Sequence, residues 1–291
     1  MPKVRKPTHS GSWYESNYAK LKAQIGSWMQ DVQPEPGTHA QAIIAPHAGY
    51  SYSGHVMAYA YKHIDPSNVS RVFLLGPSHK LYTRKCLLSS TQSYETPLGS
   101  MQIDQEVCSQ LLQTGEFEMM DVDTDEAEHS LELHTPYIVH IMGGKPFSLV
   151  PIMVGALSTS RSVLRVPLGC SVAYIVHAMG SKPLSLVPIM ISALSTSSEA
   201  KYGALLAPYL NDPSNCFIIS SDFCHWGRRF SYTFFDQDQG PIWKSIQWLD
   251  KEGMDAIESQ SPQRFADYLS TYRNTICGRH PIAVLLNVSH P

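Results

Sequence analysis

Residues 42–47 read Ala42-Ile43-Ile44-Ala45-Pro46-His47, an apolar run that stops at a proline and is followed at once by a histidine. Similar apolar runs occur three more times along the chain, at residues 72–75, 149–154 and 217–219. Short runs without polar alternation are typical of strands that are buried on both faces of a sheet. They predict a central sheet that is covered by helices.

Helical periodicity fills the intervals between these runs. Apolar residues recur at a spacing near 3.6 in residues 18–29, 53–63, 103–112, 198–210, 242–260 and 262–272. Alternation of strands and helices favours an α/β fold. We therefore expect a single domain over residues 1–291, with a central, mainly parallel or mixed sheet flanked by helices.

The composition excludes several classes of function. Charged residues make up 16% of the 291 residues and the formal net charge is −3, so no basic surface for nucleic acid is expected. The amino terminus has no apolar signal core, and no apolar run approaches the roughly 20 residues that span a bilayer. Six scattered cysteines indicate reduced thiols. We expect a cytoplasmic protein that can also be nuclear, without membrane insertion.

Polar side chains with useful chemistry follow three of the predicted strands. His47 follows the first, His79 follows the second in Gly76-Pro77-Ser78-His79, and Asp222 and His225 follow the last. Ligands of open α/β sheets gather beyond the carboxyl ends of the strands. We expect these three turns to converge.

An internal duplication interrupts the pattern. Residues 137–161 and 174–198 are near copies, with six differences in 25 aligned positions. Two copies fall short of the three units that a solenoid needs. The favoured interpretation is one duplicated helix-turn-strand unit within about residues 137–198, of which one copy fills the strand position and the other is an insertion.

Six segments together resemble the Memo family, mediators of ErbB-driven cell motility. In order, they are HSGSWY (9–14), IIAPHAGYSYSG (43–54), LLGPSHK (74–80), DEAEHSLELHTPY (125–137), SSDFCHWG (220–227) and NTICGRHPI (274–282). The resemblance implies a fold related to the class III extradiol dioxygenases, which are non-haem iron enzymes. The chain departs from the family in its duplicated unit and in stopping after residues 285–291, where members continue, so we expect a truncated carboxyl-terminal part.

The resemblance also implies a metal site on His47, His79 and Cys277, with iron or copper as the expected ion and zinc less favoured. Cys277 stands where the dioxygenases use a carboxylate, and a thiolate is a softer ligand. Classical extradiol cleavage is therefore not expected. His225 is a candidate acid or base, and Asp222 is a candidate to orient it or to support the metal.

The resemblance implies a signalling role as well: relaying signals of ErbB-type receptor tyrosine kinases to the microtubule and actin cytoskeleton in cell migration. A phosphotyrosine peptide from a receptor tail or its adaptor would occupy the cleft, and cytoskeletal regulators would be further partners. The candidate peptide-binding residues are Trp13, Tyr50, Tyr52, Trp226 and Arg229. The alternatives are an oxygen-using iron- or copper-dependent redox enzyme and a non-functional truncated isoform.

Two other groups of residues favour ordinary structural roles. His129 and His134 share a helical pattern with Glu128 and Glu132, which predicts ion pairs on a solvated helix face, and HSLELH is not the HExxH zinc motif. Three tryptophans fall at helical spacing and are expected to pack helices against the core: Trp28, Trp243 and Trp248.

Overall fold

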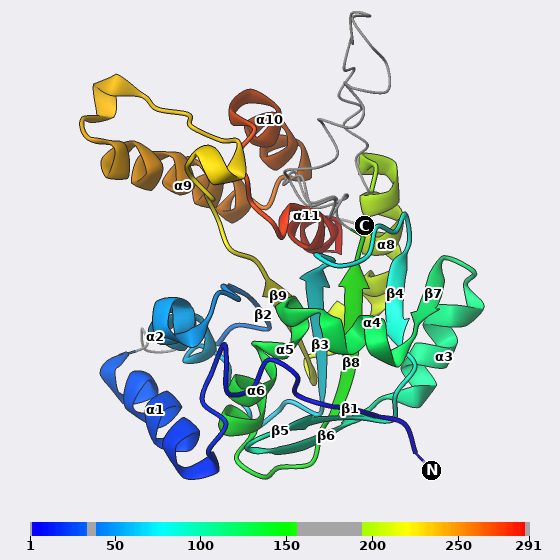
Figure 1. The fold of residues 1–291 in the computed structure, drawn as a ribbon. Coiled ribbons are helices and arrows are strands. Elements are labelled where there is room, and N and C mark those ends of the chain that lie inside the picture. Colours follow the sequence, from blue (N-terminus) through cyan, green and yellow to red (C-terminus); the bar gives the residue numbers. More distant parts are fainter. Residues whose placement is uncertain (1, 34–38, 156–193, 289–291) are drawn as a thin grey trace, which may run out of the picture.

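The structure, a computed structural model, describes residues 2–33, 39–155 and 194–288. Over these residues one nine-stranded sheet runs in the order β1-β5-β6-β8-β3-β9-β2, and β4 and β7 extend it beside β8 (Figure 1). The strands are β1 (Val4–Arg5), β2 (Ala42–Ala45), β3 (Arg71–Pro77), β4 (Cys86–Ser89), β5 (Ser93–Thr96), β6 (Gly99–Ile103), β7 (Phe117–Met120), β8 (Ser148–Val154) and β9 (Asn215–Ser220).

The pairings make the sheet mixed, as expected. The centre, β6-β8-β3-β9-β2, is parallel throughout, whereas β5 pairs with β6 and β4 pairs with β8 in antiparallel fashion. All four apolar runs of the sequence lie in the central strands β2, β3, β8 and β9. Because neighbouring parallel strands point the same way, their carboxyl ends share one edge of the sheet.

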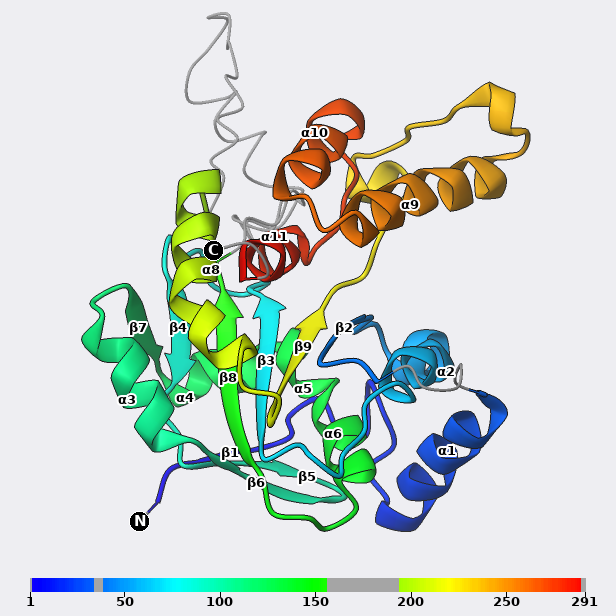
Figure 2. The ribbon, with the colours of Figure 1, turned by 180° about the vertical axis from the view of Figure 1, so that it is seen from behind.

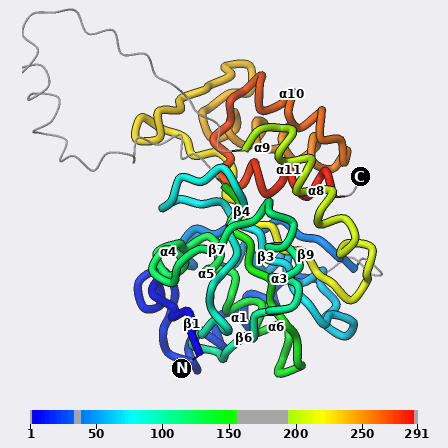
Figure 3. The backbone as a smooth tube through the Cα atoms, turned by 90° about the vertical axis from the view of Figure 1, so that its right-hand side faces the viewer, coloured from blue at the N-terminus to red at the C-terminus, as the bar shows by residue number. Residues whose placement is uncertain are grey.

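Helices cover both faces and the carboxyl edge of the sheet. They are α1 (Tyr18–Asp31), α2 (Tyr50–Tyr61), α3 (Gln105–Gln113), α4 (Val122–Ala127), α5 (His129–Glu132), α6 (Thr135–Met142), α8 (Thr196–Leu210), α9 (Ile242–Glu258), α10 (Pro262–Tyr272) and α11 (Arg279–Val288). Figure 1 shows α5 and α6 in front of the sheet, and Figure 2 shows α8 over the opposite face. The side view places α9, α10 and α11 together beyond the ends of the central strands (Figure 3).

Aromatic and aliphatic side chains of the central strands form the core. Phe73 of β3 and Phe217 of β9 are fully buried, and their rings stack with centroids 4.6 Å apart. Strands that are apolar on both faces need a cover on each side, which α5 and α8 provide. This sandwich holds the carboxyl ends of β2, β3 and β9 in fixed positions.

Most predicted helices are confirmed, with shifted ends. Asp104 caps α3 through its side chain, and Ile103 belongs to β6, so the prediction began this helix too early. Trp28 and Trp248 are partly buried against the core, but Trp243 is 62% exposed, and its predicted packing role is wrong. Its ring lies beside Lys244 instead, with Nζ 5.5 Å from the ring centroid.

The structure places one of the two duplicated copies. Residues 149–154 of the first copy lie in β8, between β3 and β6, so this copy fills the strand position. The equivalent residues of the second copy, 186–191, lie outside the described residues, and so does the predicted insertion. No helix in the described ranges is both long enough and apolar enough to span a membrane.

Candidate metal centre

The turns after β2, β3 and β9 meet at the carboxyl edge of the sheet. His47, His79 and Asp222 each stand two residues beyond the end of their strand. The rings of His47 and His79 have centroids 5.2 Å apart. The backbone amide of His47 donates to Asp222 Oδ1 at 2.9 Å. The convergence predicted from the positions of these residues after their strands is therefore present.

His47 has a defined ring orientation. Its Nδ1 lies 2.6 Å from Ser220 Oγ, and that hydroxyl donates its one hydrogen to the carbonyl oxygen of Ser130 at 2.7 Å. Ser220 Oγ can therefore only accept from His47, so Nδ1 carries the ring proton and Nε2 keeps a free lone pair. Burial and the neighbouring histidines hold the pKa of His47 well below its usual value, so the ring is neutral.

Cys277 faces that free lone pair. Its Sγ lies 3.3 Å from His47 Nε2 and accepts the Asp222 backbone amide at 3.2 Å. Burial, with Asp222 nearby, raises the pKa of the Cys277 thiol, so the sulfur stays protonated and S–H donates to Nε2. A reactive nucleophilic cysteine requires a lowered pKa. The geometry suits a cation that displaces the thiol proton better than it suits a nucleophile.

His79 is oriented by a buried carboxylate. Its Nδ1 lies 2.9 Å from Oε1 of Glu128, whose side chain is 0% exposed. Burial alone would raise the pKa of Glu128, but the hydrogen bond from His79 and the histidine charges lower it to about 2. An ionised carboxylate only accepts hydrogen bonds, so His79 Nδ1 donates. In the neutral form of the ring, Nε2 then keeps its lone pair, as in His47.

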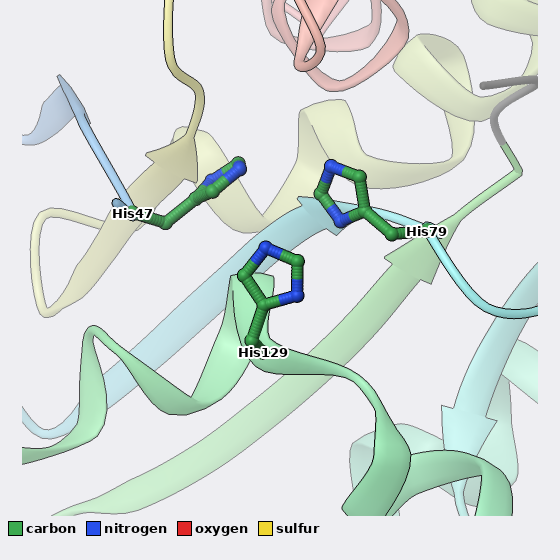
Figure 4. Close-up of side chains that lie close together, drawn as sticks. All are labelled: His47, His79 and His129. Carbon is green, nitrogen blue, oxygen red and sulfur yellow. The ribbon is translucent and has the colours of Figure 1, made fainter. Parts of the chain in front are cut away.

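His129 completes a ring of three imidazoles, and its predicted place on a solvated helix face is wrong. Figure 4 shows His47, His79 and His129 turned toward one common space. The His129 ring stacks on His79 with centroids 4.5 Å apart and lies 5.4 Å from His47. Burial, opposed by Glu128, lowers the pKa of His129 to about 4. Sequence periodicity cannot distinguish a solvated polar face from a buried polar network.

The rest of that helical pattern is buried too. Glu132 is fully buried and its Oε2 forms an ion pair with the Arg5 guanidinium at 2.9 Å. His134 is fully buried and its Nδ1 lies 2.8 Å from the Tyr61 hydroxyl. Glu132 and His134 can be buried because they have polar partners, Arg5 and Tyr61. These partners lie far away in the sequence, so the local spacing of residues did not predict the burial.

Among the described residues, donor atoms that lie within 4.8 Å of one another form two groups that share His47. One group is His47, His79 and His129, and the other is His47, Asp222 and Cys277. The predicted ligand set of His47, His79 and Cys277 is not itself one of these groups, because His79 belongs to the first and Cys277 to the second. Imidazole nitrogen and thiolate sulfur suit iron, copper and zinc, so the residues present fit a transition-metal ion.

Thr275 orients His225 on the loop that also carries Asp222. The His225 amide donates to Thr275 Oγ1 at 2.7 Å, and the ring Nδ1 donates to the Thr275 carbonyl oxygen at 2.9 Å. Asp222 accepts the backbone amides of His47 and Ala48 and donates its own amide to Cys277 Sγ. It therefore supports the candidate ligands, whereas His225 is oriented by Thr275. The sequence signal for Thr275 is its place two residues before Cys277.

The residues predicted to bind a peptide differ in their exposure and surroundings. Trp13 is 38% exposed and its ring lies 4.5 Å from that of His129. Tyr50 is 2% exposed and donates its hydroxyl to the Leu133 carbonyl, so it belongs to the core. Tyr52 is 78% exposed on α2. Trp226 donates to the Phe234 carbonyl at 2.8 Å, and the exposed Arg229 lies over Phe230.

Comparison with known proteins identifies the family. The family model described as "Memo-like protein" matches residues 5–165 and 169–290. Protein MEMO1 of Danio rerio is 47% identical over 97% of this chain and 83% of its own length. Protein MEMO1 of Homo sapiens is 44% identical over the same shares, and Protein memo-1 homolog of Caenorhabditis elegans is 39% identical over 98% and 71%. The chain belongs to the Memo family.

Proposed function

We propose that this chain is a metal-binding signalling protein whose cleft holds one iron or copper ion on His47, His79 and Cys277, with zinc less favoured. The observation that carries the proposal is the orientation of His47, whose free Nε2 lies 3.3 Å from Cys277 Sγ. Metal-binding histidines typically have one ring nitrogen in a hydrogen bond and the other free to bind the ion, as Nδ1 and Nε2 of His47 are. When bound, such an ion supplies a Lewis acid that is also redox-active.

The chain's own groups would act around the ion in defined ways. The thiol of Cys277 would give up its proton to solvent when a metal binds, and His47 and His79 would bind as neutral imidazoles. Asp222 keeps the loop of Cys277 against His47 through its amide and carboxylate. These contacts are in place without the ion, so little rearrangement of His47 and Cys277 is needed.

Metal analysis of the purified protein tests this proposal. Cys277→Ser is expected to lower the content of bound iron or copper and to weaken the affinity for added metal. Cys224→Ser is the matched control, since Cys224 is a partly buried thiol on the neighbouring loop and belongs to neither donor group. Equal metal content in wild type and Cys277→Ser would remove Cys277 from the site.

We also propose that the cleft region docks a phosphotyrosine peptide of a receptor tyrosine kinase tail or its adaptor, linking such receptors to cytoskeletal regulators. Two observations support this placement. Trp13 presents a partly exposed ring beside His129. A cavity of about 490 Å³ opens beside Trp13 and is lined mainly by polar residues, including Lys20 and Gln24.

Calorimetry with one peptide in phosphorylated and plain form tests the docking. The phosphorylated peptide is expected to bind more tightly, and Trp13→Ala is expected to weaken it. Tyr59→Ala serves as the control, because Tyr59 is an exposed aromatic residue on α2 that does not line the cavity. Equal binding of both peptides, or none, would refute this role.

An oxygen-using redox activity is the second candidate. The observation that favours it is the Asp222 carboxylate, whose Oδ2 lies 3.9 Å from His47 Nε2 and so offers the oxygen donor that non-haem iron prefers. Oxygen uptake by iron-loaded protein, compared between wild type and Asp222→Asn, tests it. Uptake that is unchanged in the variant would exclude a role for Asp222 in that chemistry.

A further inference from the structure

The metal cleft has a buried support that the family resemblance does not assign. We propose that Glu128 is a positioning residue: its carboxylate holds the His79 ring at Nδ1 by a hydrogen bond, with Nδ1 of His129 close by, and so presents Nε2 of His79 to His47. This inference rests on the proposed metal-binding function. It concerns the preparation of the site and can be tested on the protein without metal.

The contacts of the carboxylate define this role. Glu128 Oε1 lies 2.9 Å from His79 Nδ1 and 3.3 Å from His129 Nδ1. The other oxygen, Oε2, accepts the backbone amide of His79. One carboxylate therefore holds both the ring and the main chain of His79, and the second ring lies against the first in a stack.

A rigid frame holds Glu128 in turn. The amide of Ser130 donates to Glu128 Oε1 at 2.9 Å, and the Arg5 guanidinium donates to the Glu128 carbonyl oxygen at 2.9 Å. Arg5 is itself fully buried, in strand β1. The carboxylate is thus fixed from both its side-chain and backbone ends, which positioning of a metal ligand requires.

Glutamine at position 128 could not replace this carboxylate. If its amide oxygen faces the His79 ring, its NH2 group faces the His79 backbone amide, and two donors meet. If the amide is reversed, NH2 faces His79 Nδ1, and the ring proton must move to Nε2. The first arrangement loses the bond to the His79 amide. The second keeps both bonds to His79 but sets NH2 against the Ser130 amide, and it places the ring proton on Nε2, the nitrogen that would bind metal.

Two measurements test the proposal. Nitrogen NMR of histidine-labelled, metal-free protein at mildly alkaline pH reports which nitrogen of His79 carries the proton, with signals assigned by His79→Gln and His129→Gln. Wild type is expected to show Nδ1–H. Glu128→Gln is expected to shift His79 toward Nε2–H while His47, held by Ser220, stays unchanged. Zinc affinity by chelator competition should fall about 10- to 100-fold in Glu128→Gln.

Glu132→Gln is the matched control. Glu132 is equally buried one turn further along, but it binds His9, Tyr14 and Arg5 and contacts neither His79 nor His129. The Glu132→Gln variant should bind zinc as tightly as wild type, and its His79 should have the same tautomer as in wild type. An Nε2–H tautomer of His79 in wild type, or equal zinc affinity of the two variants, would overturn the proposal. If Glu128→Gln does not fold, the tautomer of His79 in the wild-type protein still tests the proposal. Failure of wild type to bind iron, copper or zinc would count against the proposed function alone, because the His79 tautomer is measured without metal.

Discussion

At the scale of single residues, Ser220 controls how His47 faces Cys277. Its hydroxyl lies between His47 Nδ1 and the Ser130 carbonyl, and all three groups are buried. Ser220→Ala leaves the ring nitrogen and the carbonyl without partners, so the free energy of unfolding should fall by about 1–3 kcal/mol. The His47 tautomer should become mixed. Urea denaturation and nitrogen NMR measure the two effects.

Ser245→Ala separates these effects. Ser245 is equally buried, and its hydroxyl accepts the amide of Asp236 far from the cleft. This variant should lose comparable stability and leave His47 in the Nδ1–H form. A His47 tautomer that does not respond to Ser220→Ala would show that another group orients the ring.

Gly278 is the residue beside Cys277, and its lack of a side chain lets two loops touch. A Cβ at this position would lie 2.3 Å from Ser221 Cβ and 2.5 Å from the Ser220 carbonyl oxygen. Gly278→Ala should therefore cost about 1–3 kcal/mol of unfolding free energy and move Cys277 away from His47. Metal content and denaturation curves measure both consequences.

Gly26→Ala is the control, because it is expected to stabilise the protein. Gly26 lies inside α1, and its nearest atom beyond the helix is 3.7 Å from the added Cβ, on the His140 ring. Alanine should stabilise the protein there by about 0.5–1 kcal/mol and leave the metal content unchanged. Destabilisation by both substitutions would mean that the close approach at Gly278 is not the cause.

At the scale of elements, Asp104 ties α3 to the sheet. Its Oδ1 accepts the Val107 amide at 3.0 Å, and its Oδ2 accepts from Arg71 Nε at 2.7 Å and Ser148 Oγ at 2.8 Å. Burial alone would raise the pKa of Asp104, but these hydrogen bonds outweigh burial and lower it. The helix cap is therefore also a charged link between β3 and β8.

That lowered pKa predicts a loss of stability in acid. The folded-state pKa lies below the unfolded value of about 3.9, so the stabilisation is complete above that value and is lost as the pH falls through the folded pKa. Asp104→Asn should be less stable than wild type near neutral pH, and the difference should narrow in acid. Thermal unfolding at a series of pH values measures it.

Asn17→Ala is the control for this pH dependence. Asn17 caps α1 by accepting the Lys20 amide at 3.1 Å and carries no charge. Its loss should cost about 1 kcal/mol independently of pH. A difference between wild type and Asp104→Asn that stays constant from neutral to acid pH would contradict the assigned pKa direction.

The elements also show what a sequence alone can predict. The strands β2, β3, β8 and β9 were predictable because an apolar run without alternation has few other uses. The positions of His47 and His79 just after two of these strands then predicted that they lie close together. The segment around Glu128 and His129 was predictable as helical but not as buried. Its carboxylates contact Arg5 and His79, and no local pattern records partners so distant in the chain.

At the scale of the whole molecule, Arg5 joins the amino-terminal strand to the helices that support the cleft. Its Nε lies 3.0 Å from Asp125 Oδ1 and its Nη1 lies 2.9 Å from Glu132 Oε2, with all three side chains buried. Burial raises the pKa of Asp125, and the Arg5 charge opposes that rise. The network spans more than 120 residues of sequence and surrounds the backbone of Glu128.

Arg5→Met should test how far the cleft depends on this network. Methionine has no charge, so Asp125 and Glu132 would stay buried without the cation that pairs with both, at a cost of about 3–5 kcal/mol in unfolding free energy. Without Arg5 the folded-state pKa values of these carboxyl groups rise above their unfolded values. The deficit should therefore be smallest in acid, where both groups are protonated, and should grow as the pH rises. Thermal unfolding against pH measures it.

The adjacent Lys6→Met substitution isolates burial as the cause. Lys6 also pairs with a carboxylate, at 2.8 Å from Glu95 Oε2, but both side chains are exposed to solvent. Exposed pairs contribute about 0–1 kcal/mol, so Lys6→Met should change stability little at any pH. If the two variants lose equal stability, the buried charge of Arg5 is not what holds β1 to α4 and α5. If Arg5→Met alone also weakens zinc binding, the amino-terminal strand supports the metal site through the backbone of Glu128, because Arg5 itself touches none of the candidate ligands.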